Sequence, residues 1–347
     1  MEKAQILQNT SKKRYGAIDG LRTFAAIGIV MMHIKANNDY AMSMSDGFSG
    51  FIYNTVITSF TNFVFLFMMV SAFGMCCGYY EKILHNKISI SDFYGKRFKK
   101  IFPFFAVLVL LDVIISPSMG ALYEAFADLT LLFGFLPGAG NITVIGVGWF
   151  IGLIFVFYLI FPFFCFLIEN KRRAWISFGI SLIYNFVCRG YFNVNRTNIL
   201  YSGCFFLAGG LVYLYKNQIE EWFTNKLWIM FIGVAISVVL YYTVGNTAMT
   251  SLLVSVALLM YAEIRRGGVL ENSITKFFSG ISMEIYLSHM VVFRVGEKIG
   301  LNRIIGTGWL QYIFTVLYVI VGATVFAVVM QKIMGIVEIK MSLKKRF

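Results

Sequence analysis

The sequence has few charged residues for its length. Charged side chains make up 14% of the 347 residues, and 59% of the residues are hydrophobic. A soluble domain usually has about 25% charged residues, and the mean hydropathy here is +0.74. A water-soluble fold of this composition would expose too much apolar surface. The shortage of charge therefore excludes the soluble class and indicates an integral membrane protein.

Cysteine and histidine are also scarce, and their spacing does not suit metal chemistry. The five cysteines lie in or beside apolar segments, and the chain has only three histidines. No CxxC motif and no alternating Cys/His ligand pattern is present. We therefore expect no disulfide framework, no metal site and no permanently bound cofactor.

The sequence contains many long apolar segments. Ten of them are long enough, or nearly so, to cross a hydrocarbon core of about 30 Å as helices. Backbone groups in lipid must be satisfied internally, so segments this continuously apolar should be helices and not barrel strands. The expected spans are 17–36, 53–79, 102–117, 145–168, 174–189, 198–215, 227–243, 248–263, 277–295 and 308–336. The sequence predicts an all-α, polytopic bundle of about ten transmembrane helices.

Positive charge gathers on one side of this predicted bundle. With ten crossings, the main basic groups share a side, at 12–14, 82–100, 171–173, 265–266 and 344–346. Loops 37–52 and 118–144, on the other side, contain no Lys or Arg. Cationic loops stay in the cytoplasm, so both termini should be cytoplasmic. The net charge of +13 is then a topology signal, and we expect no nucleic-acid partner.

The chain shows no convincing internal repeat and no low-complexity segment, so we treat 1–347 as a single domain. It comprises a short basic tail at 1–16, a helical bundle at 17–338 and a second basic tail at 339–347. The first apolar run is not followed by a small-residue cleavage site. We therefore expect no cleaved signal peptide.

The first predicted span, "AIDGLRTFAAIGIVMMHIKA", carries ionisable residues. At about 100° per residue, the step from Arg22 to His33 ends about 20° from full turns, so both side chains share a stripe about 16 Å long. Asp19 lies one turn before Arg22 and can partner its guanidinium. Alternatively, Arg22 snorkels to the surface and His33 packs against a neighbouring helix. The shared stripe favours an inward-facing polar track, because ionisable groups at membrane depth usually face a polar interior.

This stretch resembles the first-helix signature of the acyltransferase-3 family of membrane acyltransferases, in which an arginine precedes a histidine by eleven residues. The resemblance implies transfer of acyl groups, commonly acetyl, from cytoplasmic acyl-coenzyme A to glycans at or beyond the outer face. Three later stretches resemble the same family and follow in the family's order.

The second span, "FVFLFMMVSAFGM", is similar to the family's Ser-Gly-Phe stretch, with Ala72 in place of glycine. The resemblance makes Ser71 a candidate for lining a substrate cavity. A serine inside a helix is also commonly satisfied by its own backbone.

The stretch "SDFYGKRFKKIFPFF" resembles a paired-arginine motif that precedes a proline. Arg97 matches its first member, and Lys100 replaces the second. Arginine contacts phosphate in a bidentate manner, whereas lysine acts as a point charge. The resemblance implies that both bind the phosphates of coenzyme A, while Lys96 and Lys99 carry ordinary cytoplasmic charge.

The fourth span, "GWFIGLIFVFYLIFP", resembles a family stretch through Trp149, Phe157, Tyr158 and Pro162. Many relatives carry a glutamate where this chain has Ile154, which removes one candidate acid or orienting group. Trp149 and Tyr158 are candidate supporting residues, although an aromatic belt at the membrane surface would contain the same residues.

The stretch "GISMEIYLSHMVVF" resembles the family's late Ser…Tyr-Leu…His motif. Ser282, Tyr286 and His289 lie at i, i+4 and i+7, on one face of a helix. Glu284 lies on a different face and could pair with another helix. His289 is a candidate supporting residue or a histidine packed within the bundle.

These residues suggest a reaction. Acyl transfer to a hydroxyl needs a base and stabilisation of the oxyanion, and a histidine suits the base role at neutral pH. We assign that role to His33, and Arg22 to the pantetheine or phosphate part of the donor or to holding Asp19. Arg97 and Lys100 would bind the nucleotide end of acetyl-coenzyme A, a donor substrate. No G-x-S-x-G nucleophile elbow is present, which favours direct transfer.

The acceptor is expected to be a glycan or a lipid-linked glycan. Five cations break the positive-inside pattern, namely Arg189, Arg196, Arg294, Lys298 and Arg303. They could bind an anionic glycan or a lipid-linked phosphate, or they could be solvated loop charges. The expected location is a bacterial plasma membrane, in contact with its lipids and with proteins of envelope glycan synthesis.

The main alternative function is a transporter or flippase of a glycan or lipid-linked intermediate, because polar intramembrane residues also mark substrate paths. Duplicated half-chains and paired broken helices, which inverted-repeat transporters show, are missing from the sequence pattern. A sensory or scaffold protein would be expected to have long soluble loops or tails. Consumption of acetyl-coenzyme A separates the enzyme from both alternatives.

Overall fold

The computed structural model describes residues 14–37, 47–131, 133–136, 144–245 and 247–344, and these residues form helices and connecting turns without a strand. In the first half of the chain the helical elements are α2 (Gly16–Asn37), α3 (Gly47–Phe51), η1 (Ile52–Ile57), η2 (Phe60–Asn62), α4 (Phe63–Met75), η3 (Cys76–Tyr80), α5 (Glu81–Leu84), α6 (Ile90–Ile115), α7 (Met119–Thr130), η4 (Phe133–Phe135) and α8 (Trp149–Glu169). In the second half they are α9 (Lys171–Ile183), η6 (Tyr184–Cys188), α10 (Arg189–Tyr191), α11 (Ile199–Phe223), α12 (Leu227–Thr243), α13 (Ala248–Ile264), η7 (Gly268–Leu270), α14 (Ser273–Gly280), α15 (Ser282–Lys298), η8 (Leu301–Arg303) and α16 (Trp309–Lys344).

Five continuous helical segments of the described chain are long and apolar enough to cross a membrane. They are Gly16–Asn37, Gly47–Leu84, Trp149–Glu169, Ile199–Phe223 and Trp309–Ile336. A sixth span is formed if Ala248–Ile264 and Gly268–Gly280 are counted together, although the two parts are bent by 96°. The all-helical, membrane-capable bundle predicted from the sequence is therefore confirmed.

The remaining predicted spans also coincide with helices, but these helices are shorter or more charged. Helix α6 carries Lys96, Arg97, Lys99 and Lys100 in its first half. Helix α9 has 13 residues, and α12 and α15 have 17 residues each. A helix of 17 residues is about 26 Å long at 1.5 Å per residue, which is shorter than the hydrocarbon core. By length and composition alone, five or six segments of the described chain qualify as spans.

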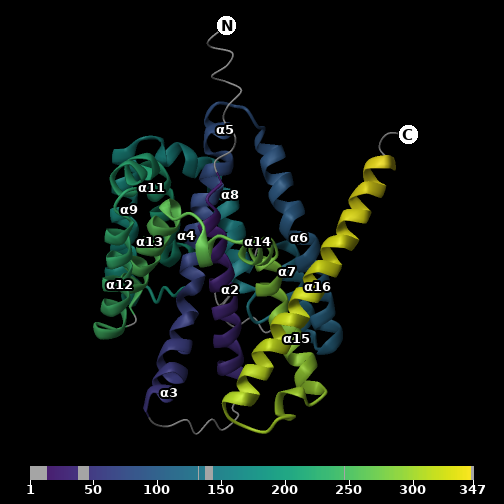
Figure 1. The fold of residues 1–347 in the computed structure, drawn as a ribbon. Coiled ribbons are helices and arrows are strands. Elements are labelled where there is room, and N and C mark those ends of the chain that lie inside the picture. Colours follow the sequence, from purple (N-terminus) through teal and green to yellow (C-terminus); the bar gives the residue numbers. More distant parts are fainter. Residues whose placement is uncertain (1–13, 38–46, 132, 137–143, 246, 345–347) are drawn as a thin grey trace.

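Helix α2 lies at the centre of the bundle and contacts α4, α13, α14, α15 and α16 (Figure 1). After the sharp bend that follows α13, helix α14 packs across the first half of α2. The short helix η7, which precedes α14, approaches α2 closely at Gly20, where an added Cβ would lie 2.3 Å from the carbonyl oxygen of Leu270. The Thr23 hydroxyl donates to the carbonyl of Thr275 at 3.0 Å. These contacts fix the rotation of α2 and hence the direction of its polar stripe.

A buried ion pair joins α6 to α15 at the end of the bundle where α6 ends. Arg294 Nη1 lies 2.7 Å from Asp112 Oδ1, and Asp112 Oδ2 accepts from the backbone N–H of Ile145 at 2.6 Å. Asp112 is only 3% exposed. Removing one partner of such a pair leaves an uncompensated buried charge, so this contact holds Arg294 in a structural role.

A second carboxylate near this pair should make the stability of the fold depend on pH. Asp128 on α7 is fully buried, and its carboxylate has no hydrogen-bond partner within the described residues. Burial, followed by the nearby Glu124 and Asp112 charges, raises the pKa of Asp128 to about 8. Because this value lies above the unfolded value of about 3.9, stability should fall as pH rises from about 4 to about 8.

We therefore expect Asp128→Asn to flatten the pH dependence of the unfolding temperature and to raise that temperature at pH 8. Thermal unfolding of the detergent-solubilised protein at pH 5 and pH 8 measures the effect. Asp92→Asn, at an exposed position at the start of α6, serves as the control. A curve for Asp128→Asn that runs parallel to the wild-type curve would contradict the assignment.

Candidate active site

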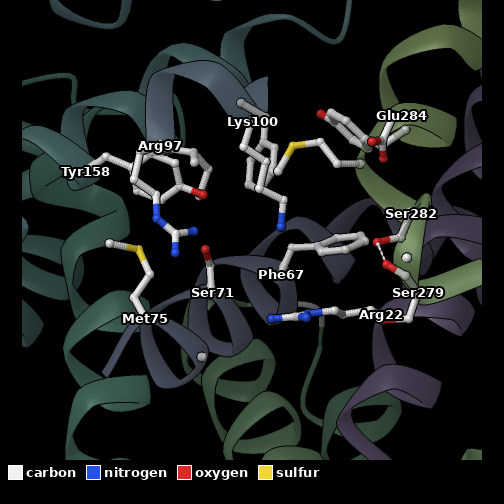
Figure 2. Close-up of a pocket in the computed structure, with 16 residues that line it drawn as sticks. Arg22, Phe67, Ser71, Met75, Arg97, Lys100, Tyr158, Ser279, Ser282 and Glu284 are labelled. Atoms are coloured by element: carbon white, nitrogen blue, oxygen red, sulfur yellow. Dashed lines mark hydrogen bonds between the residues drawn. The ribbon is translucent and has the colours of Figure 1, made fainter. Parts of the chain in front are cut away.

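A cavity of about 260 Å³ lies among α2, α4, α6, α8, α14 and α15 (Figure 2). It is lined by Arg22, Phe67, Ser71, Gly74, Met75, Arg97, Lys100, Phe150, Ile154, Tyr158, Ser279, Gly280, Ser282, Met283, Glu284 and Tyr286. The lining includes most of the site residues predicted from the sequence, and these predicted residues come from α2, α4, α6, α8 and α15. We call this space the cationic cavity, because three cations and one carboxylate line it.

The three cationic side chains that line the cationic cavity come from two helices. Arg22 comes from α2, and Arg97 and Lys100 lie one turn apart on α6. Figure 2 shows the ends of the Arg97 and Lys100 side chains directed toward Ser71, with the Arg22 guanidinium in the same space. Within the described residues, none of the three forms an ion pair with a carboxylate. The cavity therefore has an excess of positive charge that suits an anionic group.

Arg97 is oriented by aromatic rings. Its guanidinium carbon lies 4.4 Å from the centre of the Tyr79 ring and 5.5 Å from that of Tyr158. Its Nε is buried and has no hydrogen-bond partner in the described chain. Cation–π contact holds a guanidinium without using its hydrogen-bond donors. The donors of Arg97 therefore remain available to a bound ligand.

Asp19 does not hold Arg22 as the sequence had suggested. Its carboxylate accepts a hydrogen bond from Arg14 Nη2 at 2.5 Å and another from the Ser279 hydroxyl at 2.8 Å. These partners come from the segment before α2 and from α14, and the spacing of residues within α2 cannot indicate them. Arg22 is consequently left facing the cationic cavity.

Two histidines form a second cluster, outside the lining of the cationic cavity. The rings of His33 on α2 and His289 on α15 have centres 5.2 Å apart. His289 is fully buried, and its Nδ1 lies 2.6 Å from the carbonyl oxygen of Tyr286. A carbonyl can only accept, so Nδ1 carries the proton and Nε2 is the basic nitrogen. That Nε2 has no hydrogen-bond partner in the described part of the chain.

Three aromatic rings separate the two clusters. The ring centres of Phe67, Phe150 and Tyr286 lie 5.2 to 6.3 Å from one another. Tyr286 lines the cationic cavity on one side, and its ring centre is 6.0 Å from that of His289 on the other. Its hydroxyl donates to the carbonyl of Val147 at 3.1 Å. This aromatic triad forms the inner end of the cavity.

The other candidates from the sequence divide between these places. Ser71, Tyr158 and Ser282 line the cationic cavity, as does Ile154 at the position where relatives often carry glutamate. Glu284 lines it too and accepts from Gln331 of α16 at 2.8 Å, in agreement with the expected contact to another helix. Trp149 lies outside the lining, where its ring packs under the Arg196 guanidinium at 5.2 Å. Among the described residues, no group of three or more His, Cys, Asp or Glu side chains could hold a metal ion.

Comparison with known proteins agrees with this architecture. The family model described as an acyltransferase domain, of the acyltransferase-3 type, matches residues 15–328. The chain is also 27% identical over 180 residues to the acyltransferase MdmB of Streptomyces mycarofaciens, over 48% of this chain and 44% of that protein. The match thus spans less than half the length of this curated relative. No solved structure matches the chain. The chain belongs to the acyltransferase-3 family of membrane acyltransferases.

Proposed function

We propose that the protein transfers an acyl group, most simply acetyl, from acyl-coenzyme A to a hydroxyl of a cell-envelope or exported glycan. The observation that carries this proposal is the cationic cavity, which ends at an aromatic triad with a histidine pair behind it. The cavity offers what the donor phosphates need, and the histidines offer a base for the acceptor. Acetyl-coenzyme A acts here as a substrate.

The donor would bind through its anionic part. Arg97 offers a fork of N–H donors that suits a phosphate, and Lys100 adds a point charge one turn away. A volume of about 260 Å³ cannot enclose an entire coenzyme A molecule, so the nucleotide would remain toward the exposed Lys100 end. Arg22 would then meet the pantetheine or a phosphate farther in. The thioester would reach the aromatic triad.

The histidine pair would supply the base. As the acceptor hydroxyl oxygen attacks the thioester carbonyl carbon, His33 would take its proton. The carbon–sulfur bond then breaks, and coenzyme A leaves as a thiolate that recovers a proton. The buried His289 ring would hold His33 in place and offer Nε2 as a second acceptor. Arg22 and His33 lie about 16 Å apart along one helix, which places donor binding and proton transfer at different depths.

For the topology we retain ten crossings with both termini in the cytoplasm of a bacterial cell. Helix α2 begins and α16 ends at the same end of the bundle (Figure 1), as an even number of crossings requires. The basic start of α6 lies at this end as well. In this arrangement the cationic cavity is reached from the cytoplasm, where acyl-coenzyme A is made.

The purified protein in liposomes, given labelled acetyl-coenzyme A and a panel of glycan acceptors, provides the test. We expect coenzyme A release together with transfer of the label. If the folded protein neither bound the donor nor released coenzyme A, the transporter or flippase alternative would replace this proposal.

A small residue on α4 gives a sharper test of Arg22. A Cβ added at Gly74 would lie 2.9 Å from Arg22 Nη2, so Gly74→Ala should displace the guanidinium. The alanine should not harm the helix, since glycine costs about 0.5–1 kcal/mol relative to alanine inside a helix. We expect an unfolding temperature at or above that of the wild type and a loss of transfer of about tenfold to a hundredfold.

The matched control is Gly78→Ala, one turn later, where an added Cβ meets no atom within 4 Å. It should leave transfer unchanged. Equal activity of Gly74→Ala and Gly78→Ala would show that the position of Arg22 does not matter for the reaction.

A further inference from the structure

The structure gives different surroundings to the cations that break the positive-inside pattern. Arg294 is paired with Asp112, Lys298 donates to the carbonyl of Ile115, and Arg189 donates to the Tyr201 hydroxyl and lies over its ring. Arg196 differs in its position. Its side chain is exposed, packs on Trp149 and donates to the Thr61 hydroxyl at 2.8 Å.

Lys35 of α2 contacts the same helical stretch as Arg196. It follows His33 by two residues on α2, and its Nζ lies 2.5 Å from the Thr58 hydroxyl. Thr58 and Thr61 are one turn apart on the helical stretch before α4, so their side chains are neighbours about 5–6 Å apart. Within the described residues, neither Lys35 nor Arg196 pairs with a carboxylate. Two cations without a carboxylate partner are therefore bound to neighbouring threonines of one helical stretch. Arg196 also packs on Trp149, whose ring contacts Phe150 of the aromatic triad.

A groove of about 220 Å³ begins next to these threonines, between the start of α4 and helices α12 and α13. Its lining includes Ser59 and Asn62, which flank Thr61 and Thr58 in sequence. One end is rich in hydroxyl groups: Ser59 bonds to Tyr242 at 2.9 Å, and Asn62 donates to Tyr241 at 2.7 Å. The other end is apolar and is lined by Leu66, Val238, Val254 and Leu258.

This groove lies among membrane-spanning segments and opens beside α12. The side chains of α12 that face away from the bundle are apolar, and Phe231 and Val239 are 61% and 59% exposed. In a bilayer that face meets lipid chains. A hydrocarbon chain could therefore enter the apolar end of the groove from the bilayer, while a polar head stays at the hydroxyl end.

We propose that Lys35 and Arg196 bind the phosphate of a lipid-linked acceptor, and that the groove between α4, α12 and α13 holds the first part of its chain. This inference rests on the proposed acyl transfer and names the acceptor class. Two adjacent cations suit a phosphate, whereas a neutral glycan has no need of them. A sugar attached to that phosphate would have its hydroxyls next to His33.

Binding can be measured without any donor, by native mass spectrometry of the purified protein. The probes are a long-chain polyprenyl phosphate, the matching polyprenol without phosphate, and inorganic phosphate without a chain. We expect wild type to prefer the polyprenyl phosphate. Arg196→Gln and Lys35→Gln should each weaken its binding by about tenfold or more and leave polyprenol binding unchanged. Arg189→Gln, at a half-buried arginine that contacts Tyr201, should have no effect.

The groove has its own variant. Val254→Phe adds bulk to the groove lining and should weaken the binding of polyprenyl phosphate. Leu253→Phe, at the adjacent position with 44% exposure, should leave that binding unchanged. Equal binding of polyprenol and polyprenyl phosphate would overturn the phosphate site, as would normal binding by Arg196→Gln and Lys35→Gln. Binding of inorganic phosphate as tight as that of the polyprenyl phosphate, with Val254→Phe unaffected, would overturn the groove.

The proposed acyl transfer is tested by a separate measurement, which is the release of coenzyme A. A protein that binds polyprenyl phosphate through Arg196 but releases no coenzyme A would support this site and contradict the acyl transfer. Transfer to a soluble neutral glycan that Arg196→Gln and Lys35→Gln do not change would support acyl transfer and overturn the lipid-linked acceptor.

Discussion

Replacing His33 with alanine should reduce acyl transfer by about 10²- to 10⁴-fold, the usual contribution of a general base. The reason is positional as well as chemical. His33 is partly exposed, and its ring lies 5.2 Å from that of the buried His289. The third histidine, His85, lies elsewhere and contacts Glu81. Coenzyme A release and label transfer in liposomes measure the loss, and the amount of protein inserted should stay at the wild-type level.

Two further histidine variants make this result specific. His85→Ala changes an exposed histidine that contacts Glu81 on its own helical turn, and it should retain full activity. His289→Asn keeps a donor for the Tyr286 carbonyl but removes Nε2, so a loss of transfer would assign a role to that nitrogen. Near-normal activity of His33→Ala would remove His33 from the base role.

Replacing Arg97 with glutamine should raise KM for acetyl-coenzyme A by about 10- to 100-fold, with a smaller change in kcat. Hydrogen bonds to charged groups contribute about 1.5–3 kcal/mol, and each 1.4 kcal/mol is a factor of ten in affinity. Arg97 holds its guanidinium over Tyr79 and Tyr158 with Nε unused, so the loss should fall on the ligand and not on the fold. Initial rates over a range of donor concentrations give KM and kcat.

Both the protein and the donor offer a control for this prediction. Lys99→Gln removes a charge at an exposed position on the same helix that does not line the cavity, and it should leave KM unchanged. Acetyl-pantetheine lacks the phosphates, so wild type and Arg97→Gln should use it equally well. If Arg97→Gln impaired both donors to the same extent, Arg97 would not be a phosphate ligand.

Most of the helices could be predicted from the sequence, because long apolar runs have few alternatives in a membrane. The predicted 277–295 span was less accurate: α14 ends at Gly280 and α15 begins at Ser282. The sharp bend after α13 was also missed. Both features depend on how α14 packs on α2, and hydropathy along one segment contains no information on packing.

The candidate site divides in the same way. The sequence placed Arg22 and His33 on one stripe of one helix, and the cationic cavity contains Arg22 with Arg97 and Lys100. The contact of His33 with His289 could not be foreseen, since periodicity gives the face of each helix but not its neighbour. The same limit applies to Asp19, whose partners Arg14 and Ser279 lie off the stripe. Within-helix rules find only partners one turn away.

The aromatic triad of Phe67, Phe150 and Tyr286 has a consequence for the energetics of the whole cell. An energised membrane stores work as a proton and ion gradient, and a continuous aqueous channel through any of its proteins would dissipate it. The triad closes the inner end of the cationic cavity, and the tyrosine among them is anchored to Val147. In the proposed direct transfer, the acyl carbon would pass from the coenzyme A sulfur to the acceptor oxygen at these rings, so that no open channel for ions would be needed.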